Sequence, residues 1–127
     1  DSGIIRLFKS HLKEYDHGEQ SRDFVFVSDI VDIMKHFFHS SSVPSGIYNA
    51  GNGVSRSFND LANSIFSAIN KPTQIEYFDM PIKLRKSYQY FTESDMAKLS
   101  LSGYEYRPIP LEEGMQKHIE WFLSLKT

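Results

Sequence analysis

The stretch GEQSRDFVFVSDIVDIM, residues 18–34, decides the fold because its apolar residues change their spacing partway along. The run FVFV is aromatic and β-branched, which predicts a short buried strand over 23–27. From Ser28 onward the apolar residues recur at helical spacing, which predicts a helix over 28–39 with Ser28 as its N-cap. The charged residue Arg22 therefore stands at the point where a rigid strand begins.

Outward from this stretch, the same rules predict further short elements. Residues 4–8 are expected to form a strand, and the polar residues 9–21 are expected to form a loop. Residues 47–50 are expected to form a strand that stops at the glycine-rich segment 51–53. Ser57 is expected to cap an amphipathic helix that follows this segment.

The C-terminal half continues the mixture of strands and helices. A strand is expected over 75–77, then a helix capped by Thr92 that runs to about Ser100, and a last helix after Pro110. The pattern predicts an α/β fold with short strands and about four helices. Short apolar strands normally lie beside further parallel strands, so a missing partner region is expected.

Composition excludes several classes of protein. With 127 residues the chain has room for one domain with a modest core. Its net charge is −2 and its densest basic tract is KLRK at 83–86, so no nucleic acid partner is expected. No apolar run is long enough to span a membrane. There is no cysteine, which excludes disulfides and thiolate metal sites and fits a cytoplasmic location. The chain begins with Asp1, so we expect a segment of a longer protein.

Two motifs have a functional and a structural interpretation. AGNGVSR, residues 50–56, places Gly-x-Gly between a predicted strand and a helix, as in a dinucleotide phosphate loop. Arg56 stands where that motif needs a third glycine, so a tight turn is the favoured interpretation. His36 and His39 share a predicted helix, but no third ligand has suitable spacing, so no metal site is predicted.

Arg22 and Tyr88 are the candidates for ligand contact. A guanidinium fixed at the start of a strand suits bidentate capture of phosphate, although a solvated surface arginine remains the alternative. Tyr88 could offer a hydroxyl to a ligand, although its aromatic neighbours also suit a core position. No tyrosine is followed four residues later by a lysine, so the Tyr-x-x-x-Lys catalytic pair is absent.

These segments together resemble a known enzyme family. RDFVFVSDIVDIM and GIYNAGNGVSRSFNDLA resemble segments of extended short-chain dehydrogenase/reductase enzymes that act on nucleotide sugars. GEQSRDF, IEYFDMPIKLRKSYQYFTESDMAKL and LSGYEYRPIPLEEGMQKHIEWF together resemble the C-terminal part of the ADP-L-glycero-D-manno-heptose 6-epimerase family.

The resemblance implies a division of labour between this chain and a missing half. Residues 1–127 would be a single C-terminal substrate-binding portion that lacks the N-terminal Rossmann half. Residues 23–70 would complete the Rossmann-type sheet, and 71–127 would form the substrate-binding lobe. The missing half would bind NADP and carry the catalytic Tyr and Lys. No catalytic, cofactor-binding or metal-binding residue is therefore expected in this chain, and the chain alone is expected to be inactive.

The resemblance also assigns roles to individual residues. Arg22 matches an arginine that contacts the nucleotide diphosphate, and Tyr88 matches a tyrosine that contacts substrate. The substrate-lining segment of the family falls on Phe8, Lys9, Ser10 and His11.

The implied reaction inverts C6 of an ADP-heptose through NADP-dependent oxidation and re-reduction, for the lipopolysaccharide inner core. The intact enzyme would be a homo-oligomer in the bacterial cytoplasm. Alternatives are a fragment of a UDP- or dTDP-sugar epimerase or dehydratase, and a non-catalytic module that binds nucleotide sugars.

Overall fold

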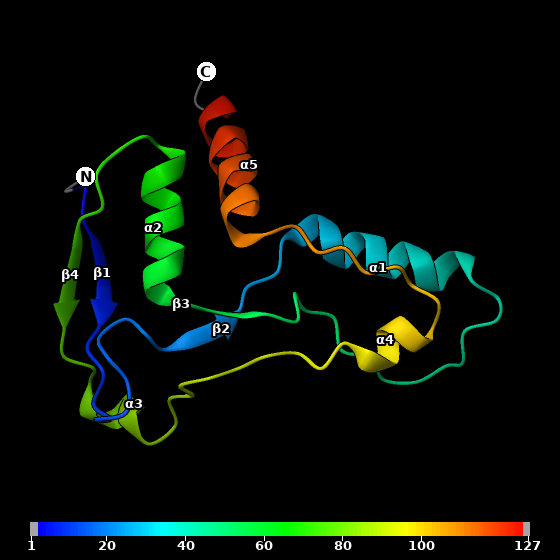
Figure 1. Ribbon diagram of the computed structural model, residues 1–127, viewed down its shortest axis with the longest axis horizontal. Coiled ribbons are helices and arrows are strands. Elements are labelled where there is room, and N and C mark those ends of the chain that lie inside the picture. The colour runs from blue at the N-terminus through cyan, green and yellow to red at the C-terminus, as the bar shows by residue number, and fades with distance from the viewer. Residues whose placement is uncertain (1–2, 126–127) are drawn as a thin grey trace.

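The structure is a computed structural model that describes residues 3–125 (Figure 1). The described residues form four short strands and five helices, in an α/β arrangement. In chain order these elements are β1 (Ile5–Phe8), β2 (Ser21–Asp23), α1 (Val27–His39), β3 (Ser55–Ser57), α2 (Phe58–Ala68), β4 (Ile75–Phe78), α3 (Ile82–Arg85), α4 (Ala97–Leu101) and α5 (Leu111–Ser124).

The strands form two separate pairs rather than one sheet. β1 and β4 are parallel, with Ile5 opposite Ile75 and Phe8 opposite Phe78. β2 and β3 are antiparallel, with Arg22 opposite Arg56. Two-stranded ladders are marginal on their own, so these pairs depend on the helices and loops packed against them.

The elements fall into two groups joined by β2, β3 and extended segments (Figure 1). The β1–β4 ladder lies with α2 and α5 in one group, and α1 lies with α4 in the other. The buried apolar residues are correspondingly few and scattered over both groups; they are Ile33, Ala62, Phe66, Met80, Tyr90 and Leu99.

The predicted strand over 23–27 is wrong. β2 ends at Asp23, and α1 already begins at Val27, whose side chain is 69% exposed. The N-cap is Phe26, which makes no side-chain capping bond, so Ser28 does not cap the helix. A strand needs a hydrogen-bonded neighbour, and within the described residues the chain offers none to this segment.

The predicted strand over 47–50 is also wrong. These residues are irregular, and Ile47 is 89% exposed. The third strand is instead β3, which follows the Gly51–Gly53 turn and pairs with β2. The prediction relied on apolar composition and put the strand too early in the chain. The position of a strand depends on the segment that it pairs with, which here is β2.

The predicted helix capped by Thr92 is shorter than expected. α4 begins at Ala97 with Met96 as its N-cap, so Thr92 does not cap it. Gly103 follows α4 with φ of +84°, a left-handed conformation that favours glycine. The short helix α3 was not predicted.

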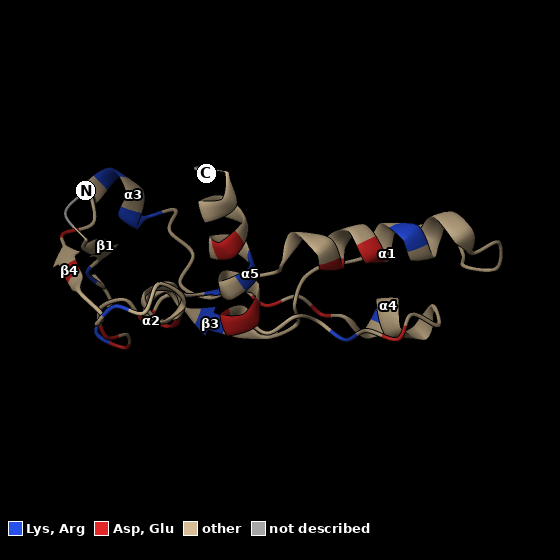
Figure 2. Ribbon diagram, turned by 90° about the horizontal axis from the view of Figure 1, so that it is seen from above, with Lys and Arg blue, Asp and Glu red and all other residues tan. Residues whose placement is uncertain are grey.

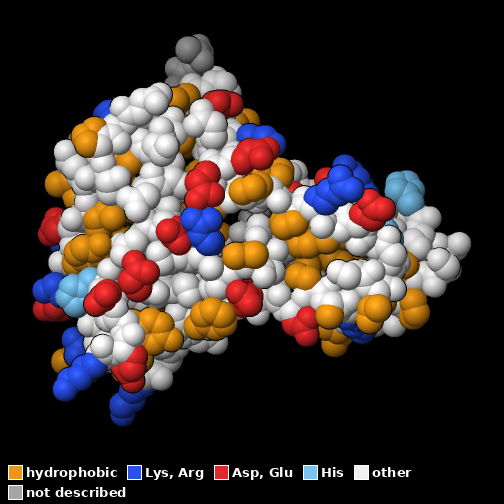
Figure 3. All heavy atoms as spheres, in the orientation of Figure 1, with side chains coloured by type: hydrophobic (Ala, Val, Ile, Leu, Met, Phe, Trp, Pro, Cys, Tyr) orange, Lys and Arg blue, Asp and Glu red, His pale blue; other side chains and the backbone are white. Residues whose placement is uncertain are grey.

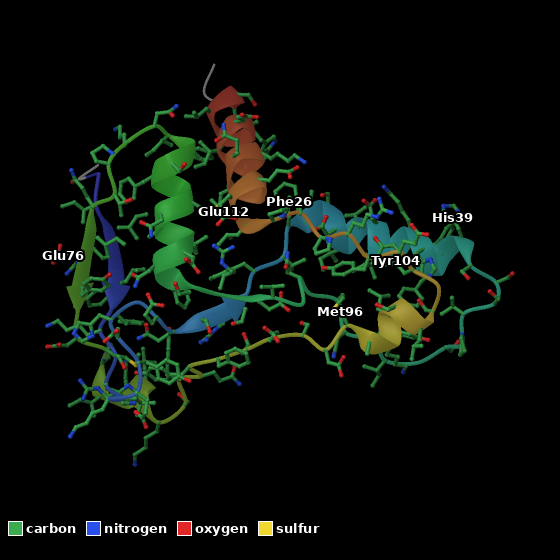
Figure 4. All side chains as sticks on the ribbon, viewed as in Figure 1. Phe26, His39, Glu76, Met96, Tyr104 and Glu112 are labelled. Carbon is green, nitrogen blue, oxygen red and sulfur yellow. The ribbon has the colours of Figure 1, made fainter. Side chains whose placement is uncertain are left out.

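The helices α2 and α5 confirm the helical patterns and pack against each other. Ser57 caps α2 in a capping box: its Oγ accepts the Asp60 N–H at 3.0 Å, and Asp60 Oδ2 accepts the Ser57 N–H at 3.1 Å. Gly114 lets α5 approach the start of α1, because a Cβ there would lie 3.2 Å from the ring of Phe26 (Figure 4).

The chain exposes more surface than a compact protein of its mass. Its accessible surface is 8874 Å², whereas about 6,900 Å² is typical of a folded monomer of 14.7 kDa. Hydrophobic side chains are visible in several groups on the face in Figure 3, including the region between the two parts of the molecule. Basic and acidic residues are both distributed along the ribbon in Figure 2, and α3 carries Lys83 and Arg85 without an acidic residue. Within residues 3–125 no helix is long and apolar enough to cross a membrane.

Candidate functional site

Arg22 is held at the middle of β2 by two backbone carbonyls. Its guanidinium donates to the Ser21 carbonyl at 2.7 Å and to the Gln89 carbonyl. The same group lies over two rings, 5.2 Å from the centre of Tyr88 and 5.8 Å from that of Phe58. An arginine has five N–H donors, so these bonds fix the guanidinium and leave others available to a ligand. Arg22 is part-buried, and a role for it in ligand binding stays a prediction.

Tyr88 joins Arg22 to the first strand. Its ring makes an edge contact with the Phe8 ring at 6.0 Å, at the end of β1. Burial raises the pKa of the Tyr88 hydroxyl above its ordinary value, although the positive charge of Arg22 acts in the opposite direction. The hydroxyl is therefore neutral at physiological pH and can donate a hydrogen bond to a ligand.

Ser10 and His11 gather around a second tyrosine, Tyr90. The Tyr90 hydroxyl oxygen accepts the His11 backbone N–H at 2.9 Å and lies 3.2 Å from Ser10 Oγ. The rings of Tyr88 and Tyr90 are 5.6 Å apart, so this pair links the segment 8–11 to Arg22. Lys9 differs, because its ammonium pairs with Asp79 at 3.2 Å. The structure thus brings Arg22, Tyr88, Phe8, Ser10 and His11 into one cluster of contacts.

Sequence reasoning missed the role of Tyr90. The sequence analysis gave Tyr90 no role, and the residue is only 8% exposed. Its hydroxyl, however, belongs to the cluster. The only signal was its position two residues after Tyr88, because alternate residues of an extended segment share a face.

Asp23 explains why a charged pair precedes the apolar run. Its carboxylate accepts three backbone N–H groups, from Asn52 at 2.5 Å, Gly53 at 3.0 Å and Ser94 at 2.8 Å. Burial alone would raise the pKa of Asp23, but these hydrogen bonds outweigh it and lower the pKa below its ordinary value. Arg22 and Asp23 thus have different tasks, since one faces the aromatic cluster and the other closes a turn.

The Gly-x-Gly segment is a turn, as the sequence favoured. Gly53 has φ of +80°, and a Cβ on Gly51 would collide with the side chains of Ser94 and Asp23. Because the N–H groups of Asn52 and Gly53 already bind Asp23, they are not free to hold a phosphate. These residues therefore do not fit a dinucleotide phosphate loop.

Arg56, in the place of the third glycine, binds other elements of this chain. Its Nε lies 3.0 Å from Asp60 Oδ2 on α2, and its Nη2 lies 2.6 Å from Glu112 Oε1 at the start of α5 (Figure 4). The position serves packing between β3, α2 and α5.

Metal chemistry finds no support in the part of the chain that the structure describes. Residues 3–125 contain no group of three or more His, Asp or Glu side chains that could hold a metal ion. The ring Nε2 of His36 lies 3.1 Å from Ser102 Oγ, so this histidine contacts the end of α4.

Part of the chain matches a family model, and its fold matches solved structures. Residues 3–51 match the NAD dependent epimerase/dehydratase family. The fold matches the UDP-N-acetylglucosamine 4-epimerase of Methanobrevibacter ruminantium with a TM-score of 0.75 and 22% identity, over 96% of this chain and 35% of that one. The predicted α/β fold is therefore confirmed as similar to part of that epimerase structure.

Sequence similarity narrows the resemblance. The chain is 39% identical over 96% of its length to ADP-L-glycero-D-manno-heptose-6-epimerase of Nitratidesulfovibrio vulgaris, and 40% identical over 98% to that of Fusobacterium nucleatum. It spans 38% and 39% of the length of these two relatives. The Helicobacter pylori enzyme of the same name has a TM-score of 0.73 at 22% identity, over 95% of this chain and 33% of that one. The predicted resemblance to ADP-heptose 6-epimerase is confirmed.

Proposed function

We propose that this chain is the nucleotide-sugar-binding part of an ADP-glycero-manno-heptose 6-epimerase. The observation that carries the proposal is the contact of Arg22 with Tyr88, in a chain 39–40% identical to relatives of that name. The cluster combines a fixed guanidinium with aromatic rings and hydroxyl groups, which suits a diphosphate joined to a base and a sugar.

In this proposal the chain binds and orients the nucleotide sugar, and the N-terminal half of the enzyme carries the catalytic residues. Arg22 grips the diphosphate, Tyr88 donates its hydroxyl, and Phe8, Lys9, Ser10 and His11 line the sugar end of the site. NADP, bound by an N-terminal Rossmann domain, would take hydride from C6 and return it. Holding the nucleotide at a fixed point lets the sugar turn. Binding energy from the nucleotide then helps to orient the reacting carbon.

The wider setting is part of the same proposal. Residues 23–70 complete the sheet of the Rossmann domain, and 71–127 form the substrate-binding lobe. The intact enzyme is a homo-oligomeric isomerase of the cytoplasm, and its product serves lipopolysaccharide synthesis.

The chain by itself is expected to have no epimerase activity, because it lacks the Tyr-x-x-x-Lys pair. Incubation of the purified chain with ADP-heptose and NADP⁺, followed by NMR of the C6 configuration, checks this expectation. Turnover above a protein-free control would contradict it.

The test of the binding proposal is substitution of Arg22. Arg22→Lys keeps the charge but loses the planar fork, so it should weaken ADP binding, and Arg22→Ala should weaken it further. Loss of a charge-assisted hydrogen bond costs about 1.5–3 kcal/mol, or roughly ten- to a hundredfold in affinity. Calorimetric titration of ADP and ADP-glucose measures the change in affinity. Titration of UDP-glucose tests the alternative that the site prefers UDP-sugars.

Arg107→Lys and Arg107→Ala are the matched controls. Arg107 is highly exposed and pairs only with Glu105 among the described residues, so its variants should bind like wild type. Thermal melts show whether each variant is folded, since Arg22 also bonds two carbonyls. Equal ADP affinity in folded wild type, Arg22→Lys and Arg22→Ala would overturn the proposal.

A further inference from the structure

The hydroxyl of Tyr90 contacts both Ser10 and His11. The ring is buried between three others, with centres 5.3 Å from His11, 4.7 Å from Tyr15 and 5.6 Å from Tyr88. Its oxygen lies 2.9 Å from the His11 backbone nitrogen and 2.8 Å from His11 Nδ1. One phenol therefore binds both the main chain and the side chain of a candidate site residue.

Counting protons assigns the direction of these hydrogen bonds. Ser10 Oγ lies 2.7 Å from the Leu12 carbonyl, which can only accept, so the single Ser10 proton lies toward Leu12. The His11 backbone N–H can only donate, so it occupies one lone pair of the Tyr90 oxygen. The nearer remaining neighbour of the Tyr90 proton is His11 Nδ1 at 2.8 Å, and Ser10 Oγ is farther away at 3.2 Å. With the proton on the shorter contact, Nδ1 is an acceptor and the imidazole proton is on Nε2.

The surrounding loop is held in a similar way. The Ser10 backbone N–H donates to His17 Nδ1 at 3.1 Å, and the Asn59 side chain donates to the His17 carbonyl at 2.9 Å. The first bond joins the two ends of the loop, Ser10 and His17, and the second joins His17 to Asn59 on α2. The orientation of His11 therefore depends on Tyr90 in a backbone that is otherwise anchored.

We propose that Tyr90 is a positioning residue of the nucleotide-sugar site, which acts by holding His11 in its Nε2–H form. Within residues 3–125, His11 Nε2 has no hydrogen-bond partner, so its proton is available to an oxygen of the bound diphosphate or sugar. Tyr90 acts through His11 and does not itself need to touch the ligand. This inference rests on the proposed function and adds a residue that the family resemblance did not assign.

The first experiment observes His11 directly. Long-range ¹H–¹⁵N NMR spectra of the full chain near pH 8, where imidazoles are neutral, distinguish the two tautomers. Wild type should show His11 as the Nε2–H tautomer, and Tyr90→Phe should show a mixture. Tyr15→Phe is the matched control, because Tyr15 packs on the same ring but its hydroxyl is outside the cluster.

The second experiment asks whether Tyr90 acts through His11. Tyr90→Phe should weaken ADP-glucose binding by about three- to tenfold, the size expected from one hydrogen bond. In a His11→Ala background the same substitution should have no further effect. A merely structural role would lower affinity equally in both backgrounds. Amide spectra confirm that each variant is folded.

The outcomes separate this inference from the proposed function. If wild type binds no ADP or ADP-glucose, the proposed function fails and the inference falls with it. If wild type binds and loses affinity in Arg22→Ala, but Tyr90→Phe binds equally well, only the inference is overturned. A His11 Nδ1–H tautomer in wild type would also overturn it.

Discussion

At the scale of single residues, Arg22 and Asp23 show how one dipeptide serves two needs. Neighbouring side chains of a strand point to opposite faces. Arg22 faces Tyr88 and the Gln89 carbonyl, whereas Asp23 faces the Gly51–Gly53 turn. The carboxylate thus closes the turn and fixes the strand from which the guanidinium projects.

Asp23→Asn should destabilise the chain by about 1–3 kcal/mol, because an amide cannot accept all three N–H groups and brings donors of its own. Denaturant titration at pH 7 measures the change in unfolding free energy. Asp16→Asn is the control, since Asp16 is exposed and, within residues 3–125, only its backbone carbonyl is bonded. Its effect should stay within about 0.5 kcal/mol.

The lowered pKa of Asp23 predicts how the stability of the chain depends on pH. The pKa of Asp23 is lower in the folded chain than its ordinary value, so its contribution to stability is present above the unfolded pKa, near 4. The contribution is lost as the pH falls through the folded pKa. The stability difference between wild type and Asp23→Asn should therefore shrink below about pH 4, and a difference that stays constant there would contradict this account.

At the scale of elements, local signals explain which predictions succeeded. The helix α2 was predicted with its cap because the apolar spacing and the Ser57–Asp60 box lie within the segment itself. The helix α5 was predicted for the same kind of reason, from its apolar face after Pro110. A helix whose apolar spacing and cap lie within its own segment can be predicted from that segment alone.

Ser57→Ala tests the cap. Loss of the side-chain bond to the Asp60 N–H should cost about 1 kcal/mol. Ser67→Ala, on the exposed side of the same helix, should be neutral or slightly stabilising because alanine favours helices. Helical signal during urea unfolding measures both variants, and equal midpoints for the two would show that the cap contributes nothing.

The failures at 23–27 and 47–50 have a shared physical cause. Apolar β-branched residues indicate that a segment will be buried, but strand geometry also needs a hydrogen-bonded neighbour from elsewhere in a fold. For the site, residue types indicated Arg22 and Tyr88, whereas the hydroxyl of Tyr90 depends on a contact 79 residues away along the chain. Such contacts follow from the whole fold and leave no local pattern.

At the scale of the whole molecule, many of the exposed large apolar side chains lie on helices. The helix α1 buries Ile33 on one side, yet it exposes four apolar side chains at helical spacing on another. These residues, which we call the α1 stripe, are Val27, Val31, Met34 and Phe38. A helix that is apolar on two sides is typical of one covered on two sides. The stripe is therefore the feature by which the isolated chain should attract other apolar surfaces.

We expect the isolated chain to self-associate through the α1 stripe and to be marginally stable. Light scattering over a range of concentrations should show an apparent mass that rises above 14.7 kDa. Phe38→Glu should reduce this association, because it places a charge within the apolar surface that would be buried. Ile82→Glu is the matched control, since Ile82 is comparably exposed but lies on α3, away from the stripe. A monodisperse monomer, with the several kcal/mol of cooperative stability that complete domains show, would contradict the prediction because such a chain would need no cover for α1.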